Sequence, residues 1–500
     1  MGRAIAATDV HWAMTRALVA SVATVAGMIL IARGLTPHDA GHYQFAEMLV
    51  LTGANVVNLG NADTGLRFVA AEPPDCGARI GRYLLSSAGW LAGIVLVLAC
   101  LASLGAWQAV VPAWLPWLGL AAGAAGLGLV EFGLLQGFGA YRSLAKVHLT
   151  VLPARVFAGL AVLWLGGGLT GLLAVLVGSQ VVGLLAMGVA LRPHLRAPAA
   201  TLTPEFRRRL RRYGWQMAVL IGLAVIVWDR SELFFLSYYS GPVAVAYYAS
   251  TFTLASFAMR LLPGVVGGLL TPKAASMSQS ERPKLAGIYQ DATRYLFAVV
   301  WPIALYGSCF ATALLTTLYG PAYAPAATAL PPLLLGAGAG AVASAEASVK
   351  FGLERPDLLL RGAYVAAVVN IILDWCLIPK YGWLGAAWAN ALAQLLAVVI
   401  GVFITCRLLD TRFPTPSVLR AVFAGGLLIP VWWICSGRWP GLPGMGVGLA
   451  ALIGLYPPLL LLTGFLTETD RRRWRTLWQR AGRGNAHPNS DHGRHHAYRD

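Results

Sequence analysis

The stretch "WQMAVLIGLAVIVWDRSELFFLSYYSGPVAVAYY", residues 215–248, joins a long apolar run to a group of charges. The run 215–228 holds one polar side chain in fourteen residues, as expected of a helix that crosses a membrane. Asp229, Arg230 and Glu232 follow directly in line with it. A helix that starts at Tyr213 places Asp229 about 24 Å along its axis, in the outer third of a span. Ionisable groups at this depth are costly in lipid, so these charges indicate a cavity or a gate.

The composition of the whole chain is that of a polytopic membrane protein. Hydrophobic residues make up 57% of the 500 residues and charged residues 12%, whereas a soluble chain carries about a quarter charged residues. Six cysteines are scattered singly, without a CxxC pattern or a histidine at ligand spacing. We therefore expect no disulfide framework, no metal site and no cofactor.

The apolar runs predict about fourteen transmembrane helices, because a helix needs about 20 mostly apolar residues to cross the hydrocarbon core. The predicted spans are 11–33, 38–60, 82–105, 113–136, 148–166, 170–191, 213–237, 242–266, 293–315, 325–350, 358–378, 383–406, 418–436 and 444–466.

The basic residues predict which way the chain is oriented. The connections on the side of the two termini hold 22 lysines and arginines, and those on the other side hold only Lys380 and Arg438. Basic loops stay in the cytoplasm, so both termini are predicted to be cytoplasmic. The net charge of +17 then needs no nucleic-acid partner, since "RRRLRR" (207–212) faces anionic lipid headgroups in this orientation.

The chain contains an internal repeat. The stretch "TPHDAGHYQFAEMLVLTGANVVNLG" (36–60) is similar to "GPVAVAYYASTFTLASFAMRLLPG" (241–264). At an offset of 205 residues, Pro37 aligns with Pro242 and Tyr43 aligns with Tyr248. Two related bundles that face each other across a central cavity are a transporter architecture. We expect an N-terminal lobe over 1–200 with spans 1–6 and a C-terminal lobe over 201–410 with spans 7–12. Two further helices over 411–470 and a basic cytoplasmic tail over 471–500 complete the prediction.

Four stretches resemble the polysaccharide-transporter family of Wzx-like oligosaccharide flippases. They are "ILIARGLTPHDAGHYQFAEMLVLTGANVVNLG" (29–60), "WDRSELFFLSYYSGPVAVAYYAS" (228–250), "LYGPAYAPAATAL" (318–330) and "NIILDWCLIPKYGWLGAAWANALAQ" (370–394). The family belongs to the superfamily of the multidrug exporters and lipid II flippases. The resemblance implies two six-helix lobes that form a V-shaped cavity and carry undecaprenyl-diphosphate-linked sugars outward.

Some polar residues inside the predicted spans are candidates for the cavity. Glu47 lies about 14 Å from the start of span 2 at His38, close to the midplane, and Asn55 follows on a broadly shared face. Arg260 occupies the repeat position of Asn55, towards the inner end of span 8. An arginine can hold a diphosphate bidentately, although it can also extend to the inner membrane surface. For Glu47 the structural alternative is a hydrogen bond inside the bundle.

Other candidates lie at the predicted outer end. Asp229 and Glu232 are three residues apart and share a helix face, and Arg33 ends span 1 on the same side. These acids with Arg33 or Arg230 form either an outer gate or part of the cavity lining. Weaker candidates are Arg16 and Arg155, and Glu131, Glu346 and Asp374 are intramembrane acids to which the sequence assigns no role.

These observations predict a non-enzymatic flippase in the bacterial inner membrane that moves a lipid-linked oligosaccharide by alternating access for O-antigen, capsule or exopolysaccharide synthesis. Its partners would be the substrate, membrane lipids, a coupling H⁺ or Na⁺, and a polysaccharide polymerase and glycosyltransferases. The nearest alternative is a cation-coupled drug exporter of the same superfamily, because a fold does not determine its substrate. A membrane glycosyltransferase or polymerase is a second alternative, but no outward loop is long or carries an acidic pair. Basic residues in the cavity favour a diphosphate, whereas a purely acidic cavity favours cations.

Overall fold

The structure is a computed structural model that describes residues 7–104, 114–196, 202–228, 231–277, 281–353, 355, 357–466 and 470. Every regular element in these residues is a helix, which confirms the predicted all-α membrane class. By length and composition, ten of the described helices could cross a membrane, or up to eleven if each bent pair is one span. All fourteen predicted spans fall on helices, but several of these are bent or interrupted, so the number of crossings is approximate.

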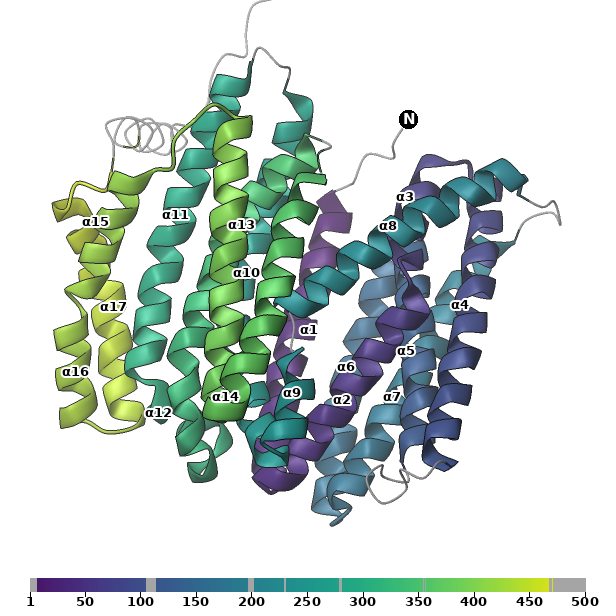
Figure 1. The fold of residues 1–500 in the computed structure, drawn as a ribbon, viewed down its shortest axis with the longest axis horizontal. Coiled ribbons are helices and arrows are strands. Elements are labelled where there is room, and N and C mark those ends of the chain that lie inside the picture. The colour runs from purple at the N-terminus through teal and green to yellow at the C-terminus, as the bar shows by residue number, and fades with distance from the viewer. Residues whose placement is uncertain are drawn as a thin grey trace, which may run out of the picture.

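The helices form two groups joined by an oblique helix, α8 (Figure 1). The first group contains α1 (Ala7–Gly34), α2 (Pro37–Asn58), α3 (Asn61–Ala71), α4 (Pro74–Leu104), α5 (Leu115–Gly137), α6 (Tyr141–Trp164), α7 (Gly168–Leu191) and the short η2 (Arg192–Leu195). Helix α5 packs against α2, α3, α4 and α7, and α1 packs against α6. We call this group the N-lobe.

The second group, the C-lobe, starts with α8. Its elements are α8 (Pro204–Trp228), α9 (Glu232–Tyr239), α10 (Pro242–Ser276), α11 (Arg282–Cys309), α12 (Ala311–Tyr319), η4 (Pro321–Ala329), α13 (Leu330–Gly352) and α14 (Asp357–Leu408). The 52 residues of α14 hold two predicted spans, because the chain bends at Gly382 with φ 54°. Span 9 is also bent, by 74° between α11 and α12. Helices α15 (Thr415–Gly426), α16 (Ile429–Arg438) and α17 (Leu442–Leu462) pack beside α11.

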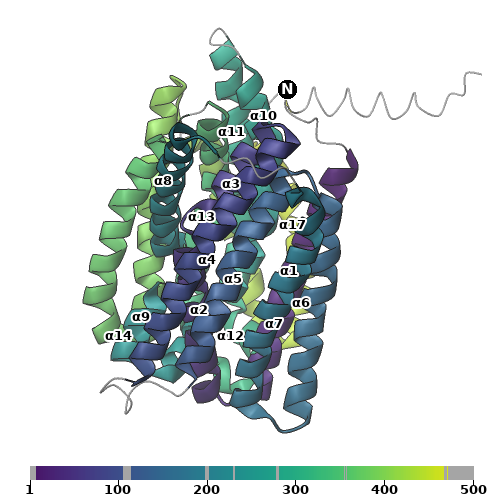
Figure 2. The same ribbon diagram turned by 90° about the vertical axis from the view of Figure 1, so that its right-hand side faces the viewer.

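Helix α3 and the course of α8 are features that the sequence analysis missed. The residues of α3 were expected to form a connection, but they form an amphipathic helix that buries Phe68 and Val69. Phe68 makes edge-to-face contacts with Phe206 and Tyr213 on α8. Near its C-terminal end α8 packs against α14, with Val227 beside Ala366 and Ala397, so it connects α3 to α14 while it runs obliquely across the molecule (Figures 1 and 2).

The two repeat-related helices, α2 and α10, pack against each other. Both begin at a proline, Pro37 and Pro242, whose fixed φ suits the first turn of a helix. Thr36 caps α2 by accepting a hydrogen bond from the amide of Asp39 at 3.2 Å. The start of α2 and α10 marks one end of the bundle, which the basic residues predict to be the outer end.

Candidate functional site

The lobes meet at the predicted outer end in a seam between α2 and α10. A Cβ atom on Gly41 would overlap the carbonyl oxygen of Pro242, so the two backbones are in direct contact. Ala40 and Ala244 are buried beside this contact. Small residues allow such close approach of membrane helices. The outer end is therefore closed in this structure along α2 and α10.

Arg33 adds a second contact between the lobes at this end. Its Nε donates a hydrogen bond to the carbonyl oxygen of Leu318 at 2.8 Å, and its Nη2 donates to the carbonyl oxygen of Thr317. These carbonyls end α12, where the helix dipole favours a cation. The contact ties α1 of the N-lobe to α12 of the C-lobe. Asp229 and Arg230 lie outside the described residues, so the predicted gate pairing of Asp229 with Arg33 or Arg230 stays a prediction.

A cavity of about 170 Å³ lies in the N-lobe between α1, α2, α6 and α7, with Thr253 of α10 at one wall. Glu47 of α2 forms an ion pair with Arg155 of α6 at 2.7 Å, and both side chains line the cavity. Arg155 also donates a hydrogen bond to the hydroxyl of Tyr43 at 3.0 Å. The Glu47 and Arg155 side chains are 21% and 26% exposed, so the pair is partly open to this space. The cavity thus presents both a cation and an anion to a ligand.

Two further candidates, Asn55 and Arg260, are not part of the Glu47–Arg155 pair. Asn55 is half-buried two turns further along α2 and does not line the cavity. Arg260 lies on α10, but its side chain is outside the described part of the structure.

The C-lobe contains a buried polar cluster around Glu232, which has no exposed surface. The hydroxyl of Tyr248 donates a hydrogen bond to Glu232 Oε2 at 2.8 Å. The amides of Asn370 and Asn390 donate to Glu232 Oε1 at 3.2 and 2.8 Å. Glu232 begins α9 at the interruption of span 7, and the two asparagines come from opposite sides of the bend in α14.

Asp374 belongs to the same cluster, since it is fully buried and interacts electrostatically with Glu232. Among the described residues, neither of its carboxylate oxygens has a hydrogen-bond partner, although both are buried, and the same holds for Asn370 Oδ1 and Gln394 Oε1. Two acids in one buried site repel each other unless a proton or a cation neutralises them. Oxygen ligands of this kind suit hard cations. No group of three or more His, Cys, Asp or Glu side chains gathers in the described residues, so the amides would complete such a site.

Sequence analysis identified Glu232 and noted Asp374, but it missed Asn370, Asn390 and Gln394. The available signal was their spacing, because Asn370 and Asp374, like Asn390 and Gln394, are four residues apart and share a helix face.

The repeat extends to the other two intramembrane acids. Glu131 on α5 faces Gly188 on α7, and Glu346 on α13 faces Gly401 on α14. Glu346 is paired with buried Lys350 and accepts a hydrogen bond from Thr405 at 3.2 Å. The N-lobe lacks this arrangement, because the position four residues after Glu131 is Leu135 and Glu131 Oε2 is buried without a partner. The equivalent sites of the two lobes therefore differ in charge.

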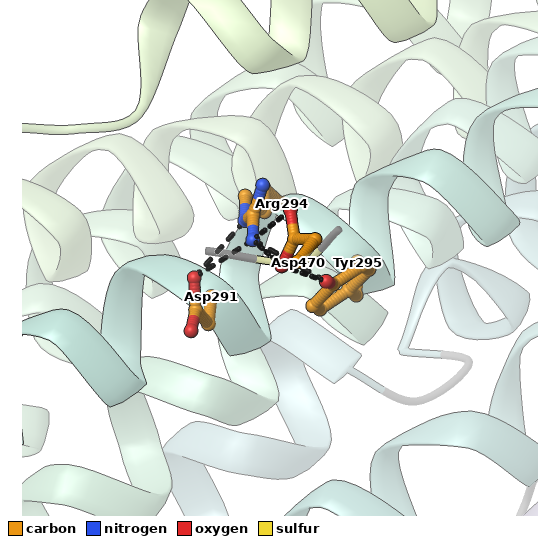
Figure 3. Close-up of polar contacts among 4 residues, drawn as sticks. All are labelled: Asp291, Arg294, Tyr295 and Asp470. Carbon is orange, nitrogen blue, oxygen red and sulfur yellow. Dashed lines mark hydrogen bonds and ion pairs between the residues drawn. The ribbon is translucent and has the colours of Figure 1, made fainter. Parts of the chain in front are cut away.

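A further ion pair anchors the end of the described chain to α11 (Figure 3). Arg294 donates two hydrogen bonds to Asp470, at 2.6 and 2.8 Å, and the hydroxyl of Tyr295 donates a third at 2.6 Å. Arg294 and Asp470 are 4% and 1% exposed. This buried pair, in which Arg294 Nη2 contacts both carboxylate oxygens of Asp470, holds Asp470 on α11 and lies outside the N-lobe cavity.

Known proteins share this fold and part of this sequence. Residues 83–328 match a family model described as polysaccharide biosynthesis protein. The lipid II flippase MurJ in an inward closed conformation superposes with a TM-score of 0.70 at 12% identity, over 91% of this chain and 98% of that chain. An inward-facing multidrug resistance MATE family transporter of the MOP superfamily gives 0.65 at 14% identity, over 80% of this chain and 98% of that chain.

A curated relative from Methanocaldococcus jannaschii, "Uncharacterized membrane protein MJ1068", is 26% identical over 234 residues. The match covers 46% of this chain and 46% of the relative, so it spans about half of the relative's length.

The fold is that of a multi-pass membrane protein, and it is similar to the folds of a lipid II flippase and a MATE family transporter. The matched residues 83–328 are just under half of the chain, and this match agrees with the resemblance to polysaccharide transporters seen in its sequence.

Proposed function

We propose that the protein is a non-enzymatic flippase of the bacterial inner membrane that moves undecaprenyl-diphosphate-linked oligosaccharide from the cytoplasmic to the periplasmic leaflet. The transported sugar would serve the synthesis of O-antigen, capsule or exopolysaccharide. Both termini face the cytoplasm in this proposal. The observation that carries it is the polar N-lobe cavity, where Glu47 and Arg155 are presented to a ligand inside the membrane.

The charge of the cavity supports a lipid-linked sugar over a cationic drug. A cation-selective exporter needs a predominantly acidic cavity, but Arg155 supplies a positive charge beside Glu47. A guanidinium can hold a phosphate bidentately, and a carboxylate can accept hydrogen bonds from sugar hydroxyls. The drug exporter and the membrane glycosyltransferase or polymerase remain the alternatives that the assay below distinguishes.

We propose that a coupling cation, H⁺ or Na⁺, binds at the Glu232–Asp374 cluster of the C-lobe. The cluster contains two buried acids, and four of its buried oxygen atoms, two of them on Asp374, have no hydrogen-bond partner among the described residues. Binding a cation there would remove the repulsion between the acids and so stabilise one arrangement of α9 against α14.

Transport can be tested with the purified protein in vesicles that contain a fluorescent undecaprenyl-diphosphate oligosaccharide. We expect the protein to expose the sugar to a membrane-impermeant glycosidase on the opposite side, faster when an inward H⁺ or Na⁺ gradient is present. Uptake of organic cations without sugar transfer would favour the drug exporter. Formation of a new glycosidic bond would favour the enzyme.

A second prediction concerns Arg260. We expect Arg260→Ala to reduce transfer of the diphosphate-linked sugar, and Arg260→Lys to retain part of it, because lysine keeps the charge but loses the bidentate geometry. The measurement is the transfer rate in the same vesicles at equal protein level. Wild-type transfer by the alanine variant would mean that Arg260 only extends to the membrane surface.

A further inference from the structure

An apolar groove of about 560 Å³ runs along the C-lobe between α11, α13 and the second half of α14. Its floor consists of buried side chains, among them Val300, Leu334 and Val342. Its rim on α14 carries Val399 and Phe403, which are 64% and 60% exposed. Since these helices cross the membrane, a groove of this composition excludes water and takes up hydrocarbon.

One arginine stands among the residues that line the groove. Arg412 lies in the connection between α14 and α15, at the predicted cytoplasmic end, and its side chain is exposed. Within the described residues Arg412 forms no ion pair, not even with Asp410 two positions earlier. The groove is therefore lined by apolar side chains, with one cationic residue, Arg412, at its predicted cytoplasmic end.

The connection that carries Arg412 is held in place by α11. The side-chain amide of Gln290 donates hydrogen bonds to the carbonyl oxygen of Arg412 at 2.7 Å and to the hydroxyl of Thr411 at 2.9 Å. The backbone of Arg412 is thus held beside the groove, and its exposed side chain has no ion-pair partner among the described residues. A backbone that is already ordered reduces the entropy lost when the side chain binds an anion.

We propose that this groove is a binding site for one anionic phospholipid of the cytoplasmic leaflet, with an acyl chain in the groove and the phosphate on Arg412. Basic pockets between transmembrane helices on the cytoplasmic side are suited to anionic headgroups. A guanidinium forms charge-assisted hydrogen bonds with phosphate, and burial of each CH₂ group of the chain adds about 0.8 kcal/mol. The lipid would join α11 to α14 across a surface where their side chains leave space.

The site is separate from the proposed transport path. The N-lobe cavity is lined by α1, α2, α6, α7 and Thr253, and it shares no residue with the groove. We infer that the groove holds a resident membrane lipid, not the transported substrate. An experiment can therefore contradict the proposed lipid site without contradicting the proposed transport function, and the reverse also holds.

The test uses the full-length protein purified in neutral detergent, with phosphatidylglycerol and phosphatidylcholine of identical acyl chains as probes. We expect native mass spectrometry to show one retained phosphatidylglycerol, and thermal unfolding to shift upward with this lipid more than with phosphatidylcholine. Arg412→Gln should weaken phosphatidylglycerol binding about tenfold or more and phosphatidylcholine binding less, because the choline cation of phosphatidylcholine already offsets the attraction of its phosphate to Arg412.

Two variants complete the experiment. Arg361→Gln removes an exposed arginine near the start of α14, on the same predicted cytoplasmic side because the chain reverses at Gly382, without touching the groove, so it should bind phosphatidylglycerol like the wild type. Ala339→Trp fills the groove and should weaken both lipids. Equal binding of the two lipids by the wild type, or equal loss in Arg361→Gln and Arg412→Gln, would overturn the proposal, and this comparison decides it even if Ala339→Trp does not fold.

Discussion

Asp374→Asn should lower the affinity for the coupling cation roughly 100-fold or more and nearly abolish gradient-driven transport. Asp374 is fully buried, and neither carboxylate oxygen has a hydrogen-bond partner in the described structure. Among the described residues no cationic side chain pairs with Asp374, so we expect a proton or a bound cation to neutralise its charge. Asparagine has nearly the same shape but neither the charge nor the ability to take up a proton.

The same substitution should leave the fold intact or stabilise it. Asp374 interacts electrostatically with Glu232, and a neutral side chain removes the repulsion between them. Replacing buried charges by neutral groups often stabilises a protein by about 1–4 kcal/mol. Transport and stability are thus expected to change in opposite directions, which a purely structural role of Asp374 would not produce.

The matched control is Asp357→Asn, at the start of the same helix. Asp357 is exposed and pairs with Arg355 at 2.9 Å on the surface, where an ion pair contributes little. We expect Asp357→Asn to transport like the wild type. The measurements are sugar transfer with and without an ion gradient, and thermal unfolding with increasing Na⁺ or H⁺. If the Asp374→Asn variant shows normal gradient-driven transfer, the Glu232–Asp374 cluster does not bind the coupling cation.

The fold was predictable from the sequence because lipid imposes a simple requirement on each span. Every crossing needs a long apolar helix, and this requirement is met locally. The prolines at positions 37 and 242 marked the starts of α2 and α10 within one residue of the prediction. Interruptions were less predictable, as the bend of 74° between α11 and α12 inside predicted span 9 shows.

The site was less predictable because its contacts join distant positions. The sequence placed Glu47 at the membrane midplane, but its partner Arg155 comes from α6, 108 residues away, and was only a weak candidate. Asn390 reaches Glu232 across 158 residues, and it does so because the chain reverses at Gly382 between the two halves of α14. Helical spacing identifies side chains that share a face, but it does not say which faces meet.

Arg33 illustrates the same limit. Its position at the predicted outer end of span 1 indicated a gate, and the structure does use it to join the lobes. Its described partners are backbone carbonyls at the end of α12, however, and these have no signature in the side-chain sequence. A search for acidic partners could not have found them.

The contact between Gly41 and Pro242 leads to the last expected result, that Gly41→Val opens the outer end. The added side chain would overlap the backbone of Pro242, which cannot move aside as a flexible side chain would. Overpacking of this kind costs about 1–3 kcal/mol. Because the strain exists only when α2 and α10 are closed together, it shifts the population towards the outward-open state by roughly 5- to 150-fold.

The accessibility of Ala244, which is 2% exposed at the seam, reports this shift. In a cysteine-free background, Ala244→Cys should react with a membrane-impermeant maleimide at least about tenfold faster when Gly41→Val is present. The matched control is Gly93→Val on α4, where an added Cβ atom meets nothing within 4 Å. Sugar transfer should fall in Gly41→Val even though the protein is folded, because alternating access requires both states to be populated. If maleimide labelling stays at the wild-type rate while transfer falls, the seam is not the outer gate, and the contact of Arg33 with α12 becomes the place to look for it.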